Sequence, residues 1–170
     1  MVELSETVGK STWQQVPESD DSPVSELLQN RLSTDDVIQW SESFDVLLSH
    51  EHGMAAFREF LKTEFSDENI EFWLACEDYK KITPHAKLVT KANEIYEEFI
   101  NIQAPREINI DFYTREATKQ SLRTPSPASF SEAQGIIYGL MEKDCYPRFI
   151  RSTLYMDLLN LTQTQCQKSV

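Results

Sequence analysis

The sequence predicts an all-α domain, and three observations support this fold class. Apolar residues recur at intervals of three and four, which is the period of an amphipathic helix. Residues that favour helix starts precede most of these stretches. No stretch shows the strand–helix–strand rhythm of a parallel sheet, and no internal repeat is present. Because 170 residues suit one domain with a tail, we expect helices around a single core.

The first helical pattern begins at Ser33, which forms a capping box with Asp36. One helix, or two short helices that meet near Ser41, would bury Val37, Trp40, Phe44, Leu47 and Leu48. Gly53 interrupts this pattern. The next helix carries an apolar stripe and should stop near its last member; the stripe is Ala56, Phe57, Phe60, Leu61 and Phe65.

Two longer helices follow in the central part of the chain. Ser66 is the predicted N-cap of the first, with Asp67 and Glu68 at the positive end of its helix dipole. Thr83 and Pro84 are the predicted N-cap and first residue of the second. Because the connecting turn is short, we expect the two helices to lie antiparallel. Their apolar faces include Ile70, Trp73, Leu74 and Tyr79 in the first, and Leu88, Ala92, Ile95, Tyr96 and Phe99 in the second.

Apolar and polar residues alternate over the segment 103–110, but the stretch is too short to pair in a sheet. We therefore expect an ordered loop that begins with a turn at Pro105. Asp111 is expected to cap a helix that reaches about Ser121. The segment 124–127 then forms a connection.

Ser129 and Glu132 form a second capping box, for a helix that Pro147 should limit. Its apolar face consists of Ala133, Ile136, Ile137, Leu140 and Met141. A last helix starts near Ser152, with Leu154, Tyr155, Leu158 and Leu159 facing inward. The expected organisation is a flexible acidic leader over residues 1–33, the helical domain over 34–161 and a polar tail over 162–170.

The composition excludes several classes of function. Lys and Arg total 16 against 28 Asp and Glu, a net charge of -12, so nucleic-acid binding and electrostatic docking on anionic lipid are not expected. The longest apolar runs fall far short of the roughly 20 residues that span a bilayer. The N-terminus resembles no signal peptide, which predicts a cytoplasmic protein. The widely spaced Cys76, Cys145 and Cys166 predict reduced thiols rather than disulfides or a zinc site.

Common catalytic motifs are missing from the sequence: it holds no phosphate-binding loop, dinucleotide turn, nucleophile elbow or zinc-protease helix. His50 and His52 would point to opposite sides of a helix, so we interpret them as a solvated helix end rather than a metal site. Glu64 and Glu68 have the spacing of paired carboxylates, yet charged residues at a helix end usually form a solvated rim. The sequence therefore predicts no catalytic residue, no metal and no cofactor.

Polar side chains concentrate in three segments near predicted helix ends, over residues 64–69, 106–109 and 143–148. An antiparallel bundle brings alternate helix ends to one side, so these loops could converge on a recognition face. Three unrelated solvated turns remain the alternative.

The same three segments resemble the signature motifs of the regulator-of-G-protein-signalling (RGS) family. The stretch from Phe60 to Trp73, FLKTEFSDENIEFW, is similar to the family signature almost without gaps. The stretches 104–111 (APREINID) and 140–144 (LMEKD) are similarly close. The likeness covers residues 43–159 and is closest to the small, single-domain members.

The resemblance implies a two-lobed bundle of about nine helices whose loops bind the switch segments of GTP-bound Gα subunits. It implies a Gα-binding surface of Glu64, Phe65, Ser66, Glu68, Asn69, Glu107, Asn109, Leu140, Asp144, Cys145 and Arg148. In the family, the residue that matches Asn109 touches the glutamine that orients the attacking water.

The implied activity is that of a GTPase-activating protein, which terminates signalling from G-protein-coupled receptors and has no catalytic site of its own. It would act by ordering the catalytic groups of Gα in the transition state. A non-catalytic Gα-binding effector antagonist or scaffold is the alternative.

Further expectations concern partners and location. We expect a monomer that binds Gα subunits of the Gi/o or Gq class and reaches the inner face of the plasma membrane mainly through them. The leader departs from the basic, cysteine-bearing start of several small members, since it holds six acidic residues and no Cys. Cys145 stands where relatives commonly have Ser, which bears on the Gα classes accepted. Cys76 is expected to be a buried thiol, although relatives are acylated in the matching helix.

Overall fold

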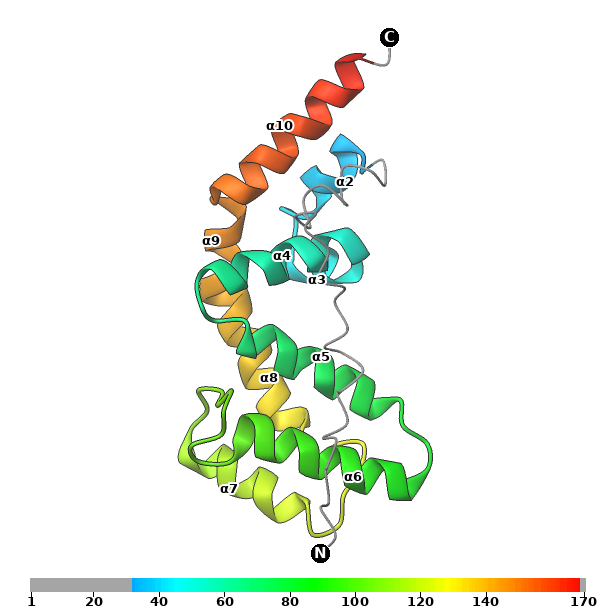
Figure 1. Ribbon diagram of the computed structural model, residues 1–170, viewed down its shortest axis with the longest axis vertical. Coiled ribbons are helices and arrows are strands. Elements are labelled where there is room, and N and C mark those ends of the chain that lie inside the picture. Colours follow the sequence, from blue (N-terminus) through cyan, green and yellow to red (C-terminus); the bar gives the residue numbers. More distant parts are fainter. Residues whose placement is uncertain (1–31, 169–170) are drawn as a thin grey trace, which may run out of the picture.

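All regular structure in the residues that the structure describes is helical, as predicted. The computed structural model describes the backbone of residues 32–168 and the side chains of residues 32–163, so the predicted leader up to Arg31 lies outside it. Figure 1 shows two lobes stacked along the long axis. One lobe holds α5 (Glu68–Lys80), α6 (His85–Ile95), α7 (Phe112–Ser121) and α8 (Ser131–Leu140). The other holds α2 (Thr34–Gln39), α3 (Phe44–Ser49), α4 (Glu51–Thr63), α9 (Tyr146–Ile150) and α10 (Thr153–Lys168).

Aromatic rings form the core of each lobe. In the lobe of α4 and α9, Phe57 contacts Phe44 and Phe149, with ring centroids 5.3 and 5.5 Å apart. In the other lobe, Phe130 packs edge-on against Tyr79 at 5.1 Å, and the hydroxyl of Tyr79 donates to the carbonyl of Ser126. Edge-to-face pairs of this kind add to the stability that burial of the rings provides.

A continuous helical segment joins the two lobes. α8 passes into the π-helical turn η3 (Met141–Cys145), and η3 passes into α9 without a break (Figure 1). The prediction that Pro147 limits this helix is therefore wrong. Pro147 lies in the first turn of α9, where its fixed φ suits a helix and its missing N–H is tolerated. The segment carries Leu140, Asp144 and Arg148 along its length.

The N-terminal end of the described chain is tied to α10. The hydroxyl of Tyr155 donates to the carbonyl of Val37 at 2.7 Å. Leu32, which we had placed in the leader, is buried in the core. The helix α10 continues beyond Leu161 to Lys168, and Thr162 is buried, so the tail predicted to begin at residue 162 starts as helix.

Two predicted side-chain caps are confirmed, whereas the caps that Ser43 and His50 form for α3 and α4 were not predicted. Ser33 accepts from the N–H of Asp36, and Asp111 accepts from the N–H of Thr114. Of the two alternatives predicted for this region, one helix or two short helices that meet near Ser41, α2 and α3 confirm the second.

Three other predicted starts are wrong by one residue, because backbone turns rather than side chains begin those helices. The observed N-caps are Asp67 instead of Ser66, Pro84 instead of Thr83, and Phe130 instead of Ser129. The hydroxyl of Ser129 instead accepts from the N–H of Ser126, within the preceding loop. As predicted, α5 and α6 pack together and run in opposite directions (Figure 1).

Gly53 does not interrupt a helix, contrary to the prediction. It lies buried inside the first turn of α4, where α3 and Trp40 approach its Cα. A Cβ atom there would lie 2.7 Å from the carbonyl oxygen of Leu47. The residue is a point of close approach between α4 and the preceding helices.

Candidate functional site

The first polar segment, residues 64–69, is the sharp turn between α4 and α5. Phe65 adopts a left-handed backbone conformation with φ of 57°, and the N–H of Ser66 returns to the carbonyl of Leu61. Such a turn usually has glycine at the left-handed position, and a bulky residue there is uncommon. The turn directs the ring of Phe65 outward, so that 92% of the residue is exposed. Phe65 therefore lies outside the apolar stripe of α4 in which the sequence placed it.

The third polar segment contacts the first through Arg148. Its guanidinium on α9 forms ion pairs with Glu64 and, at 3.0 Å, with Asp144, and lies over the ring of Phe60. The hydrogen bonds to Glu64 and then Asp144 raise the pKa of Arg148 further above its ordinary value, so this cation is permanent. Segments 64–69 and 143–148 are thus neighbours.

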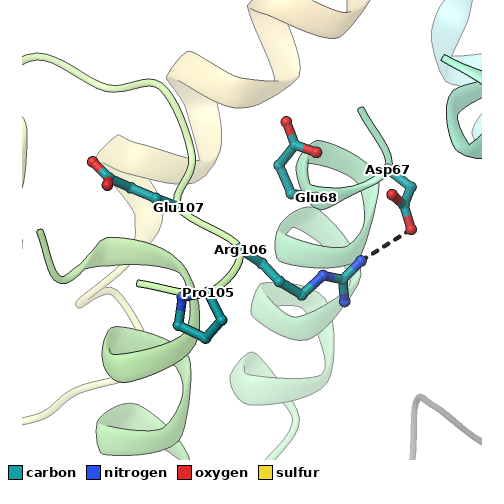
Figure 2. Close-up of a pocket in the computed structure, with 5 residues that line it drawn as sticks. All are labelled: Asp67, Glu68, Pro105, Arg106 and Glu107. Atoms are coloured by element: carbon teal, nitrogen blue, oxygen red, sulfur yellow. Dashed lines mark hydrogen bonds and ion pairs between the residues drawn. The ribbon is translucent and has the colours of Figure 1, made fainter. Parts of the chain in front are cut away.

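The second polar segment contacts the first through Arg106. Its Nη2 lies 3.0 Å from Oδ2 of Asp67, the N-cap of α5 (Figure 2). Between these two loops lies an open cavity of about 250 Å³. Its lining is charged, with three carboxylates and one guanidinium, and consists of Asp67, Glu68, Pro105, Arg106 and Glu107. The turn before α5 therefore lies next to both other segments.

Asn109 is the exposed member of an alternating stretch in the second segment. Its neighbours Ile108 and Ile110 are buried, so the chain directs the amide of Asn109 away from the core. The N–H of Ile108 donates to the carbonyl of Phe99 at 3.0 Å, which attaches this stretch to the π-helical turn η2 (Tyr96–Ile100).

Several predicted site residues lie beneath the surface. Asn69 is 7% exposed and Cys145 is 2% exposed. The Oγ atom of Ser66 is buried and has no hydrogen-bond partner within the part of the chain that the structure describes. Burial raises the pKa of the Cys145 thiol, which is therefore neutral. The side chains that remain at least partly exposed are Glu64, Phe65, Glu68, Glu107, Asn109, Leu140, Asp144 and Arg148.

Two arginines near the second segment, Arg106 and Arg115, were not predicted to take part in the site. Arg106 lies within the quoted motif, but neither it nor Arg115 on α7 was assigned a role. The charge pairs that they form join residues far apart in the chain, and no local pattern reveals such partners.

Other kinds of site find little support among residues 32–168. Within these bounds no group of three or more His, Cys, Asp or Glu side chains is arranged to hold a metal ion, and His50 caps α4 by accepting from the N–H of His52. None of the helices described is both long and apolar enough to cross a bilayer. Cys76 is buried as predicted, and burial raises the pKa of its thiol.

Comparison with known proteins links this geometry to one family. Residues 43–158 match the family model of the regulator of G protein signaling domain. The chain is 64% identical over 138 residues to regulator of G-protein signaling 8 of Danio rerio, covering 81% of this chain and 79% of that protein. It is 63% identical over 133 residues to the Mus musculus protein of the same name, covering 78% and 74%. Regulator of G-protein signaling 5 of Sus scrofa is 54% identical over 127 residues, covering 75% and 70%.

Proposed function

The chain belongs to the regulator of G protein signaling family, and on that premise we propose that its three polar segments, a turn, a loop and a stretch of helix, bind the switch segments of GTP-bound Gα. As a member of that family, it is a GTPase-activating protein for the α subunits of heterotrimeric G proteins and terminates receptor signalling.

The single observation that carries the proposal is the central place of the turn before α5. Glu64 in this turn pairs with Arg148 of the third segment, and Asp67 pairs with Arg106 of the second. The second and third segments, which lie far apart in the sequence, therefore both border the first. A contiguous face of this kind is what a helical scaffold needs in order to contact a second protein.

The face presents chemically distinct groups to a partner. An aromatic ring projects from Phe65, an amide from Asn109, a cation from Arg148, and carboxylates from Glu68 and Asp144. The buried side chains of Asn69 and Cys145 support this face from below rather than extending from it. In this arrangement Cys145, the chain neighbour of Asp144, influences Gα selectivity from the core beneath the face.

The proposed mechanism requires no catalytic atom from this chain. Gα carries its own arginine and hydrolyses GTP slowly, at about 10⁻² s⁻¹, so a partner has to order groups that are already present. Asn109 would contact the glutamine that orients the attacking water, as its match in the family motif implies. Contacts that are stronger in the transition state than in the ground state lower the barrier of the hydrolysis step.

The proposed partner and location rest on membership of the same family. We propose Gα subunits of the Gi/o or Gq class as partners, a monomeric state, and a cytoplasmic location with recruitment to the inner face of the plasma membrane through Gα. The net charge of -12 supports recruitment by a protein rather than by anionic lipid.

Single-turnover GTP hydrolysis on purified Gα tests the role of Asn109. We expect Asn109→Ala to reduce the stimulated rate at least roughly tenfold, equivalent to about 1.4 kcal/mol, without lowering the thermal midpoint. Asn93→Ala is the matched control, because Asn93 is an exposed asparagine on α6. An unchanged rate for Asn109→Ala, or an equal loss for Asn93→Ala, would refute the proposed role. Binding to Gα by the unmodified chain without any acceleration would indicate an effector antagonist instead.

A further inference from the structure

We infer that Arg106 and Arg115 are positioning residues that hold the loop 101–111 so that Asn109 meets Gα in one geometry. The inference rests on the proposed function, because it assigns a role in the same site. Neither arginine is among the predicted contact residues. Arg106 lies within the loop that displays Asn109 and contacts the start of α5, whereas Arg115 reaches the loop from α7.

Arg106 attaches the loop to two elements at once. Its Nη2 lies 3.0 Å from Oδ2 of Asp67, and its Nη1 lies 3.7 Å from Oε1 of Glu98 on η2. The guanidinium also lies over the ring of Phe99, 5.7 Å from its centroid. The backbone N–H of Arg106 donates to the carbonyl of Glu98 at 3.1 Å. Side chain and backbone therefore anchor the same residue, three positions before Asn109.

The shape of the Arg106 side chain suits this task. A planar guanidinium can address two carboxylates in different directions, whereas the ammonium of lysine is a single point charge. Half-burial raises the pKa of Glu98, and Arg106 opposes this rise by favouring the ionised carboxylate. Loss of the arginine would therefore leave Glu98 partly buried beside fewer positive charges. Figure 2 shows the guanidinium of Arg106 extended toward the carboxylate of Asp67 at the start of α5.

Arg115 holds the other side of the loop. It is buried to 9% exposure, donates to the carbonyl of Ile100, and its Nη2 lies 3.1 Å from Oε2 of Glu107. The second oxygen of Glu107 accepts from the N–H of Gln103, which has a left-handed φ of 66°. One carboxylate therefore links a buried cation to a strained turn of the backbone. Glu107 stabilises its own loop through these bonds, in addition to any contact with Gα.

These anchors explain how a loop without regular structure can hold Asn109 in one geometry for contact with Gα. Ordering a mobile chain costs conformational entropy for every residue that is fixed, and a loop ordered only on binding would lose that free energy from its interaction with Gα. Anchored loops avoid the cost, and a displacement of about 1 Å at a positioning group can reduce a rate by roughly 100-fold. The two arginines thus contribute to the stimulated rate through Asn109.

A double-mutant cycle between Arg106 and Asn109 tests the inference with the full-length chain and purified Gα. The measured quantity is the single-turnover rate at saturating activator, with the concentration for half-maximal effect as a second readout. We expect Arg106→Gln to lower the saturating rate roughly tenfold in the unmodified chain and less than roughly twofold in the Asn109→Ala background. Arg106→Lys should retain an intermediate rate. Arg123→Gln removes an exposed positive charge elsewhere and should change neither value.

Hydrogen exchange supplies a readout that is independent of Gα. In Arg106→Gln, the N–H groups of residues 106 and 108 should exchange faster, while those of the core helix α8 should keep their rates. If Arg106→Gln lowers the thermal midpoint substantially, Arg106→Lys and Glu107→Gln replace it in the double-mutant cycle with Asn109→Ala, because each leaves a side chain of similar size. For Glu107→Gln, we expect coupling to Asn109 and faster exchange at residue 103.

The outcomes separate the inference from the proposed function. Equal rate losses in the two backgrounds, or unchanged exchange in the loop, would overturn the positioning role while leaving the contact role of Asn109 intact. If Asn109→Ala itself leaves the rate unchanged, the proposed function of this face fails and the inference fails with it.

Discussion

Replacing Gly53 by alanine provides a stringent test of the packing around α4. The added Cβ would lie 2.7 Å from the carbonyl oxygen of Leu47, 2.9 Å from its Cδ1 and 3.1 Å from Cε2 of Trp40. The nearest of these atoms belongs to the backbone of α3, so it cannot move away by a rotamer change. Either α3 or α4 has to shift for the methyl group to fit.

Two opposing effects decide the sign of the change in stability. Alanine favours a helix over glycine by about 1 kcal/mol, which would stabilise the variant. Forcing an extra methyl group into a packed interior costs typically about 1–3 kcal/mol, and contacts under 3.0 Å place this site at the upper end. We therefore expect Gly53→Ala to lower the free energy of unfolding by about 1–2 kcal/mol, a decrease in thermal midpoint of roughly 3–8 °C.

Urea unfolding followed by circular dichroism measures this difference, and Gly135→Ala is the matched control. Gly135 lies within α8, and a Cβ atom there would meet nothing within 4 Å. The control should therefore gain about 0.5–1 kcal/mol from helix propensity alone. A Gly53→Ala variant as stable as the unmodified chain, or two variants that shift in the same direction, would refute this account of the packing.

Three further predictions follow from individual side chains. Hydrogen bonds from Thr114 hold the pKa of Asp111 below its ordinary value, so its stabilising effect is present at neutral pH and lost as pH falls through the folded pKa. The thermal midpoint of Asp111→Ala should thus fall less between pH 7 and pH 3 than that of the unmodified chain. An equal fall in the two proteins would contradict this. Arg148→Ala should weaken Gα binding roughly threefold and flatten its salt dependence, measured by titration at two ionic strengths; identical slopes would remove this charge from the face. Tyr79→Phe should cost about 1 kcal/mol in urea unfolding, because the carbonyl of Ser126 loses its donor; a neutral result would show that water replaces the hydroxyl.

The sequence predicted the helices well because helical periodicity is a local property. Apolar stripes placed α2 to α6, α8 and α10, and the predicted caps at Ser33 and Asp111 are confirmed by side-chain bonds to the first turn. The side-chain caps of α3 and α4, formed by Ser43 and His50, were missed. Starts that a backbone turn determines, as at Asp67 and Phe130, were misplaced by one residue. The π-helical turn η3 left no signal in the sequence, so Pro147 was interpreted as a stop.

The candidate site was less accessible to sequence reasoning. Motif resemblance drew attention to the correct segments, but exposure depends on the fold. A left-handed backbone turns Phe65 outward, and the folded core buries Cys145. The partners of Arg106 and Arg115 come from elements that only the tertiary structure brings together. Contact with Gα by the individual residues remains a prediction.

The unbroken helical segment from Ser131 to Ile150 has a consequence for how the chain can tolerate changes in length. One residue inserted into a helix rotates everything beyond it by about 100° and shifts it by about 1.5 Å. An insertion between the lobes would therefore swing α9 and α10 away from α4, whereas the same insertion in the exposed connection 122–129 would leave both lobes in place. A one-residue length change in a family member should thus fall in that connection and not in the segment that joins the two halves of the fold.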